Sequence, residues 1–175
     1  QAVIKDAEGA VYEGTVVNGA RSGTGKLVHP EGFTLEGTWS EGQLNGKGKI
    51  LSANGDTYEG DLVAGRREGT GTSTTASGDS YTGEYLNDQR NGSGTFKGAD
   101  GYTYEGMWAE GRAEGQGTVT YPDGSVQTGI FLDNLAEGTG KITYPDGSTY
   151  EGDWVAGVIE GQGRATYPNG MVYEG

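Results

Sequence analysis

The stretch YPDGSTYEGDW, residues 144–154, decides how this chain folds. In its second half, rings or a glycine stand at residues 150, 152 and 154, and acids stand at residues 151 and 153. Strict alternation of this kind predicts a β-strand that turns its rings to one face and its acids to the other. Its first half contains Pro145-Asp146-Gly147, which has the residues of a tight turn.

The length of that turn follows from the strand on its other side. Residues 141–144 read Lys-Ile-Thr-Tyr, so apolar and polar side chains alternate there as well. A three-residue loop puts Ile142 on the same face as Tyr150, whereas a two-residue loop would put it with the acids. Proline suits the second position of a type I turn, and glycine suits the left-handed residue that follows. We therefore predict a bulged hairpin with Ile142 opposite Tyr150 and Gly140 opposite Gly152.

The same hairpin motif recurs along the whole chain with a period of 23 residues. Tyrosine marks the first position of six units, and Leu35 and Gln127 occupy that position in two others. Positions 3, 8, 12, 14 and 21 of the unit hold 35 of the 36 glycines, and only Gly98 lies elsewhere. No insertion interrupts the period, which is the signature of a repeat protein.

This period makes residues 1–175 one continuous repeat domain. We place a partial repeat at 1–11 and the start of an eighth repeat at 173–175. The seven full repeats, numbered 1 to 7, are 12–34, 35–57, 58–80, 81–103, 104–126, 127–149 and 150–172. Each repeat is one hairpin that pairs with the next. The expected fold class is all-β: an elongated, single-sheet antiparallel meander or solenoid of β-hairpin repeats, twisted into a trough.

The unit Tyr-Glu-Gly-x-Trp-x-x-Gly-x-x-x-Gly-x-Gly resembles the MORN repeat (membrane occupation and recognition nexus), and residues 150–163 fit it best. The resemblance covers essentially the whole chain. Repeat 4 departs from it at Thr82 and Asp88, and repeat 6 departs at Gln127, Thr128 and Asn134. The resemblance implies a module for assembly or anchoring, and it is much less specific about function than about fold.

The glycine positions differ in what replaces them. Position 8 is glycine except for Asp88 and Asn134, and these residue types tolerate positive φ best after glycine. We therefore expect a left-handed turn residue there. Positions 3, 12 and 14 accept no other residue, so we expect rings of neighbouring strands to lie flat over those backbones.

Charge limits the kinds of partner. The chain has 12 basic and 25 acidic residues, a net charge of −13, which opposes binding to nucleic acid and to anionic membranes. Residues 98–175 carry a net −9, against −4 for residues 1–97. The C-terminal half is therefore the better surface for a basic partner.

Segments that direct a protein to a membrane are not found in this sequence. No apolar run reaches the ~20 residues of a membrane span, and no stretch resembles a signal peptide. We expect a soluble protein and favour the cytoplasm. A periplasmic or secreted location stays open, because the chain begins at Gln1 rather than at methionine.

Catalytic chemistry requires residues outside the repeat pattern, and the sequence offers few. His29 stands where other repeats have tyrosine, so we interpret it as one more ring. Asp100, Asp123 and Asp146 recur in the turns, where a row of calcium ligands is the alternative to aspartates that bond their own backbone. The glutamates at position 2 are interpreted as a solvated row. We expect no enzyme, no cofactor and no metal.

The best functional candidates are the rings and the acids beside them. A row of aromatic residues is expected to form the core, and, because a single-layer sheet should leave rings partly exposed, also a partner-binding trough. This row is Trp39, Tyr58, Tyr85, Trp108, Phe131 and Trp154. The acidic rim is Glu105, Glu110, Glu151 and Asp153.

The leading hypothesis is a non-enzymatic scaffold that binds another protein, with a basic segment of the partner against the acidic rim. The first alternative is a lipid or membrane-association module, and the second is a glycan binder. The open first and last strands also predict a homo-oligomer through the repeat ends.

Overall fold

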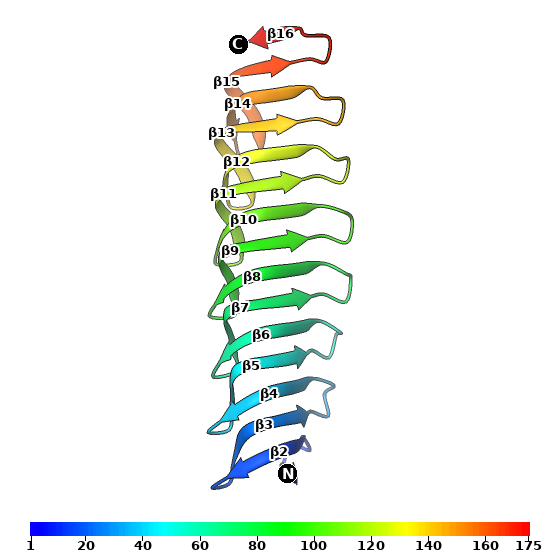
Figure 1. Cartoon of the computed structure of the whole chain (residues 1–175), viewed down its shortest axis with the longest axis vertical. Helices are drawn as coiled ribbons and strands as arrows, with labels where there is room; N and C mark the ends of the chain where they lie inside the picture. The colour runs from blue at the N-terminus through cyan, green and yellow to red at the C-terminus, as the bar shows by residue number, and fades with distance from the viewer. The chain divides into compact units, whose positions relative to one another are not determined.

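The computed structural model describes all 175 residues and contains strands and turns but no helix. The chain divides into two units, Gln1–Gln89 and Arg90–Gly175, called unit 1 and unit 2. Within each unit the strands follow one another in sequence order, and the longer loops lie on the right in Figure 1. The predicted all-β meander is confirmed.

Neighbouring strands within each unit pair antiparallel, alternating seven-residue and nine-residue strands over most of the chain. The strands of unit 1 are β1 Ala2–Lys5, β2 Val11–Val17, β3 Ala20–Val28, β4 Thr34–Ser40, β5 Gln43–Leu51, β6 Thr57–Val63, β7 Arg66–Thr74 and β8 Ser80–Leu86. Strand β9, Gln89–Lys97, begins at the boundary. The remaining strands of unit 2 are β10 Thr103–Ala109, β11 Arg112–Thr120, β12 Val126–Leu132, β13 Leu135–Thr143, β14 Thr149–Val155, β15 Val158–Thr166 and β16 Val172–Glu174.

The loop between β13 and β14 has the predicted geometry. Ile142 lies opposite Tyr150 and Gly140 opposite Gly152, as expected for a three-residue loop. The amide of Gly147 donates to the carbonyl of Tyr144 at 2.9 Å, and Gly147 has a φ of +85°. Turn chemistry and alternation therefore fix the register of this hairpin.

A two-residue turn joins the strands at the other end of each repeat. Asp88 and Asn134 have φ values of 67° and 69°, which confirms a left-handed residue at position 8. Position 7 is left-handed as well, even where it is Ala64 or Glu110, with φ near 49° in both. Two consecutive left-handed residues define a type I′ turn, whose twist matches that of the paired strands.

The glycines at positions 12 and 14 serve different purposes. At position 14, a Cβ atom on Gly117 would overlap the ring of Tyr104, as the sequence predicted. Position 12 is a β-bulge with positive φ, and Gly138 there has a φ of +67° and open space around it. The expectation of crowding is therefore wrong at Gly138, where backbone conformation excludes other residues. At Gly69 and Gly161 a Cβ atom would also lie 2.9 Å from Oδ2 of an aspartate at position 4, and not against a ring. A bulge bends its strand, which accounts for the curved strands in Figure 1.

Candidate functional site

The tyrosine at position 1 builds the core of most hairpins. The ring of Tyr104 lies against Gly117 on the next strand. Its hydroxyl donates a hydrogen bond to the carbonyl of Met107, at position 4, at 2.9 Å. The same bond is made by Tyr12, Tyr58, Tyr81 and Tyr150. The ring is thereby fixed flat over its own hairpin, on the side that we call the aromatic face.

The six residues of the candidate row lie within this core. Their exposed fractions are between 3% and 7%, so the expectation that a single-layer sheet leaves them partly open is not met. Edge-to-face contacts join repeats, and the ring centroids of Tyr104 and Phe131 are 5.2 Å apart. Tyr58 is a position-1 tyrosine, and Leu62 takes position 5 in that repeat. The rings therefore act first as core.

Side chains at position 10 explain why the rings are covered. The guanidinium of Arg21 lies 4.8 Å from the ring centroid of Trp39, and that of Arg67 lies 5.2 Å from Tyr85. Planar guanidinium groups stack favourably on aromatic faces. Leu44 and Ala113 occupy the same position in other repeats and are themselves buried. One layer of sheet thus covers its rings with its own side chains.

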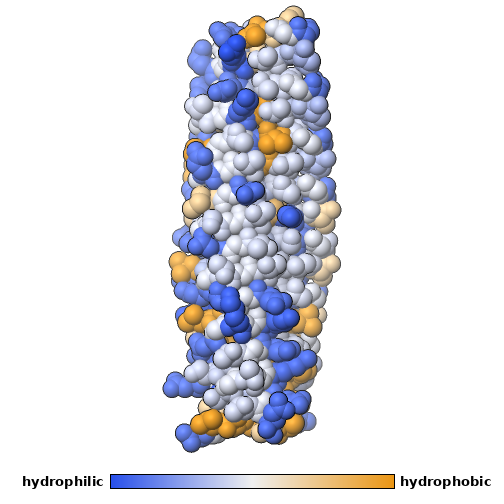
Figure 2. Space-filling model, in the orientation of Figure 1, coloured by the Kyte–Doolittle hydropathy of each residue, from blue (hydrophilic) through white to orange (hydrophobic).

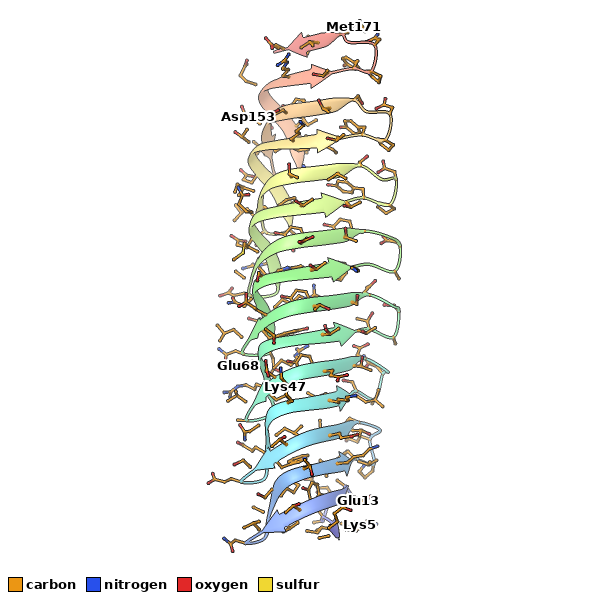
Figure 3. All side chains as sticks on the ribbon, viewed as in Figure 1. Lys5, Glu13, Lys47, Glu68, Asp153 and Met171 are labelled. Atoms are coloured by element: carbon orange, nitrogen blue, oxygen red, sulfur yellow. The ribbon has the colours of Figure 1, made fainter.

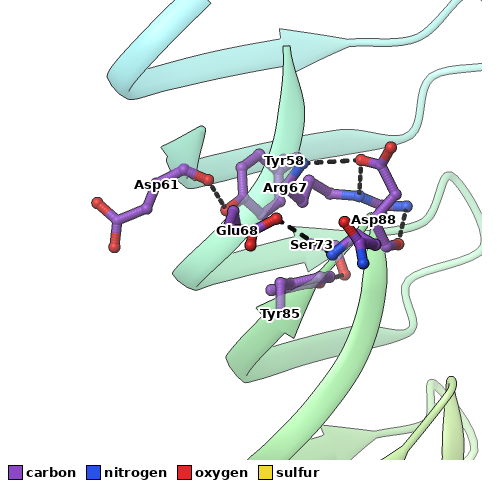
Figure 4. Close-up of polar contacts among 8 residues, drawn as sticks. Tyr58, Asp61, Arg67, Glu68, Ser73, Tyr85 and Asp88 are labelled. Atoms are coloured by element: carbon purple, nitrogen blue, oxygen red, sulfur yellow. Dashed lines mark hydrogen bonds and ion pairs between the residues drawn. The ribbon is translucent and has the colours of Figure 1, made fainter. Parts of the chain in front are cut away.

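Hydrogen bonds hold this cover in place in unit 1 (Figure 4). The amide of Arg67 donates to Asp88 Oδ1 at 2.8 Å, and its Nη2 donates to the Asp88 carbonyl at 2.6 Å. The hydroxyl of Tyr58 donates to the carbonyl of Asp61 at 2.7 Å. Burial, with smaller contributions from Tyr85 and Asp61, raises the pKa of Tyr58 to about 12. These groups form a structural network.

The acids of the expected rim do not border the rings. Glu105, Glu151 and Asp153 stand at even positions, on the polar face of the sheet, opposite the aromatic face. Asp153 accepts a hydrogen bond from the amide of Gln162 at 3.1 Å, which satisfies the backbone at the bulge. Glu110 lies in a two-residue turn and forms an ion pair with Arg112 at 3.3 Å. Asp153 and Glu110 therefore serve separate local contacts, and the four acids do not form one rim.

An open hollow of about 640 Å³ lies on the polar face of unit 1. Its floor is the backbone of glycines at positions 3 and 14, and its sides are polar side chains of repeats 2 to 4. Figure 2 shows pale surface bordered by hydrophilic residues here, and Figure 3 labels Lys47, one of the lining residues. The lining includes Lys47, Lys49, Glu59, Thr70, Thr72 and Thr82. The glutamates at position 2 were expected to form a solvated row, and the hollow beside them was not predicted.

Ion pairs fix the charged side chains around this hollow. Lys49 lies 3.3 Å from Glu59, and Lys47 lies 2.7 Å from Asp61. The bond from Lys47, followed by the backbone amide of Thr70, holds the pKa of Asp61 below its usual value. Opposite charges are therefore paired along the hollow and leave the threonine-lined centre neutral.

Repeat 6 has a polar core because Gln127 replaces the tyrosine. Gln127 and Ser125 are buried, and Tyr121 donates a hydrogen bond to Gln127 Oε1 at 2.5 Å. The indole of Trp154 lies over Gly140, in the place that a tyrosine ring occupies over the equivalent glycine of repeats such as repeat 5. Gln127 Nε2, Ser125 Oγ and Trp154 Nε1 have no hydrogen-bond partner within the protein. The sequence marked Gln127 as an exception but gave no sign of this rearrangement.

The turn aspartates bond their own backbone. Asp123 Oδ1 accepts from the amide of Ser125 at 2.8 Å, and Asp146 Oδ1 accepts from that of Ser148 at 2.8 Å. No group of three or more acidic or histidine side chains is arranged to hold a metal ion. His29 stacks on Phe33 with ring centroids 4.3 Å apart.

The structure contains no helix long and apolar enough to cross a membrane.

Comparison with solved structures finds domains of similar fold. The TCP domain of SAS-4 from Drosophila melanogaster, solved in complex with a proline-rich motif of Ana2, aligns with a TM-score of 0.56 and 17% identity. The alignment covers 99% of this chain and 88% of that one. The TCP10 domain of CPAP from Danio rerio aligns with a TM-score of 0.58 and 12% identity over 99% of this chain and 82% of that one. At such identities the likeness concerns the fold alone.

Comparison with sequences gives the family. No curated protein matches this chain. The sequence profile of the MORN repeat matches at residues 12–34, 36–57, 58–80, 81–101, 104–126, 128–149 and 150–172. Since these matches cover most of the chain, the protein belongs to the MORN repeat family.

Proposed function

We propose that this chain is a non-enzymatic scaffold that binds an extended segment of another protein in the polar-face hollow of unit 1. The observation that carries the proposal is the hollow itself, with its glycine floor and its volume of about 640 Å³. The aromatic face is filled by its own side chains, so the hollow is the better-formed surface for a ligand.

The chemistry of the hollow suits a rigid, ring-bearing segment. A backbone floor without side chains gives flat groups such as proline rings a surface to lie on, and Thr70 and Thr72 are among the residues that line it. A polyproline II segment is already extended, so it loses little conformational entropy on binding. Lys49 and Glu59 stand beside the centre, where they can select charged residues of the partner.

The likeness to the SAS-4 domain gives support at the level of the fold. That domain was solved in complex with a proline-rich motif of Ana2, so a protein of similar fold binds a proline-rich segment. The proposal for this chain rests on its own hollow.

Selection from a library of short random and proline-rich peptides tests the proposal on the full chain. We expect the wild type to enrich extended peptides, and Thr70→Trp to weaken their binding by at least ~10-fold because the indole fills the hollow. Thr139→Trp is the matched control. Both threonines stand at position 13 and donate a hydroxyl hydrogen bond to a position-4 aspartate, Thr70 to Asp61 of its own repeat and Thr139 to Asp153 of the next repeat. Thr139 lies outside the hollow.

Equal weakening by both variants, or no enriched peptide, would contradict the proposal. A second experiment measures binding of the full chain to anionic phospholipid vesicles. Binding to vesicles in place of peptides would favour the membrane-association alternative.

A further inference from the structure

Two neighbouring hairpin tips of unit 2 are apolar on both strands. Leu132 pairs directly with Leu135, and Val155 pairs directly with Val158. The exposed fractions of these four side chains lie between 47% and 62%. Exposed aliphatic residues are common singly, but paired on consecutive repeats they form a patch.

The two tips are in contact. The amide of Gly157, in the turn of repeat 7, donates to the carbonyl of Ala136 in repeat 6 at 2.8 Å. A Cβ atom added to Gly157 would lie 3.4 Å from Leu135 Cδ2. Ile130, 39% exposed, stands two residues before Leu132 and so on the same side of β12. The patch therefore extends from the tips onto the polar face.

A large aliphatic residue at position 9 distinguishes these two tips from the tips of earlier repeats. Repeats 6 and 7 have Leu135 and Val158 there. Repeat 1 has the small Ala20, and repeats 2 to 5 have Gln43, Arg66, Gln89 and Arg112. The repeat fold therefore does not require an apolar residue at position 9, and the patch is a particular property of repeats 6 and 7.

Carboxylates border this patch. Glu137 and Glu160 follow Leu135 and Val158 by two residues, and Asp153 precedes Val155 by two. Glu137 Oε2 accepts a hydrogen bond from the amide of Ala156 at 2.9 Å, which holds it against the second tip. Residues 127–175 contain seven acids and only two bases, Lys141 and Arg164. Arg112 of repeat 5 pairs with Asp133 of the first tip at 3.0 Å, so the border is mainly acidic, with one base neutralised by an ion pair.

We propose that these tips bind a basic amphipathic segment of another protein. Its aliphatic side chains cover Leu132, Leu135, Val155 and Val158, and its lysines or arginines face Glu137 and Glu160. Apolar contact supplies the affinity, and the mainly acidic border selects a basic partner over an acidic one. This site is separate from the hollow of unit 1 and does not depend on it.

A fluorescent amphipathic peptide of leucine and lysine, and its analogue with glutamate in place of lysine, are the probes. We expect the lysine peptide to bind the full chain and the glutamate analogue not to bind. The double variant Leu135→Gln/Val158→Gln introduces the residue that repeats 2 and 4 have at this position. It should weaken binding by at least ~10-fold in fluorescence anisotropy.

Val17→Gln/Val63→Gln is the control, because it removes two exposed aliphatic side chains from tips of unit 1. It should change affinity by less than ~2-fold. Thr70→Trp should also leave this affinity unchanged, which separates this site from the hollow. Raising the salt concentration should weaken binding by screening the border.

Equal losses in the two double variants, or equal binding of the glutamate analogue, would overturn the proposal. Sedimentation velocity supplies one more outcome. Self-association of the wild type that Leu135→Gln/Val158→Gln abolishes would assign the patch to a second copy of this chain instead.

Discussion

The tyrosine at position 1 and the glycine at position 14 depend on each other. The ring of Tyr104 occupies the space that a side chain on Gly117 would need, and its hydroxyl satisfies the Met107 carbonyl. Burial raises the pKa of Tyr104 to about 12. A residue that looks like a repeated binding group is therefore part of the scaffold.

Alkaline pH should reveal this burial. The unfolded chain releases a tyrosine proton near pH ~10, whereas folded Tyr104 holds it until about pH 12. Stability that is fully present below pH 10 is therefore lost as the pH rises towards 12. Tyr104→Phe should cost ~1 kcal/mol at neutral pH through the lost hydrogen bond, and should flatten the alkaline decline. Denaturant midpoints at neutral and alkaline pH measure both effects, and an unchanged decline would contradict the burial of this hydroxyl.

Trp108 and Glu105 test the assignment of the two faces. Trp108 is buried and its Nε1 donates to the Gly94 carbonyl at 3.1 Å, whereas Glu105 is exposed. Trp108→Ala should cost ~3 kcal/mol, the low end for a buried aromatic residue because the sheet is one layer thick. Glu105→Ala should change stability by less than ~0.5 kcal/mol. Equal midpoints in denaturant would mean that the faces are reversed.

Each repeat has two connections between strands. The geometry of the three-residue loop was predictable from the sequence, whereas that of the two-residue turn was predictable only in part. Proline, aspartate and glycine at 145–147 fixed the three-residue loop and its register, which the structure confirms. Asp88 and Asn134 revealed positive φ at position 8. Position 7 has positive φ with residues as different as Ala64 and Glu110, so residue type gave no signal there.

The covering of the aromatic rings by side chains at position 10 could not be predicted from the sequence either. Alternation assigns a side chain to a face, but it does not say how far Arg21 or Arg67 reaches across that face. The hollow on the polar face was missed for the same reason, because it depends on the bend of several strands together. The replacement of a tyrosine ring by Trp154 depends on space left by Gln127 in the preceding repeat.

Substituting alanine for the glycine at position 14 should destabilise different repeats by different amounts, because the group that lies over this glycine differs between repeats. Gly117→Ala places a methyl group into the ring of Tyr104, whereas Gly140→Ala meets Trp154 atoms at 3.4 Å and the Thr128 carbonyl at 2.9 Å. Gly117→Ala should therefore be the more destabilising, by ~1–3 kcal/mol. Thermal melts of the two variants make the comparison. A larger cost at Gly140 would mean that the carbonyl, and not the ring, limits this position.

At the scale of the molecule, each unit is a chain of repeats that contact mainly their neighbours. Stability in such proteins is close to a sum of repeat and interface terms, so opening should begin where a strand has least cover. In unit 2, β16 is exposed at every residue and β15 at most residues, while β11 contains buried Ala113 and Val119. Amide hydrogen exchange should be faster in β15 and β16 than in β11. Uniform protection across unit 2 would indicate a single cooperative domain instead.

The central claim is that the aromatic face is core and that the polar-face hollow receives the partner. Nuclear magnetic resonance of the labelled full chain, titrated with a peptide selected against it, tests this claim most directly. We predict saturable shift changes concentrated at Lys47, Thr70, Thr72 and Thr82, which line the hollow. The ring signals of Trp39, Tyr58 and Tyr85 should stay unchanged, because those side chains are buried. Shift changes concentrated on these rings, with the hollow unaffected, would contradict the account.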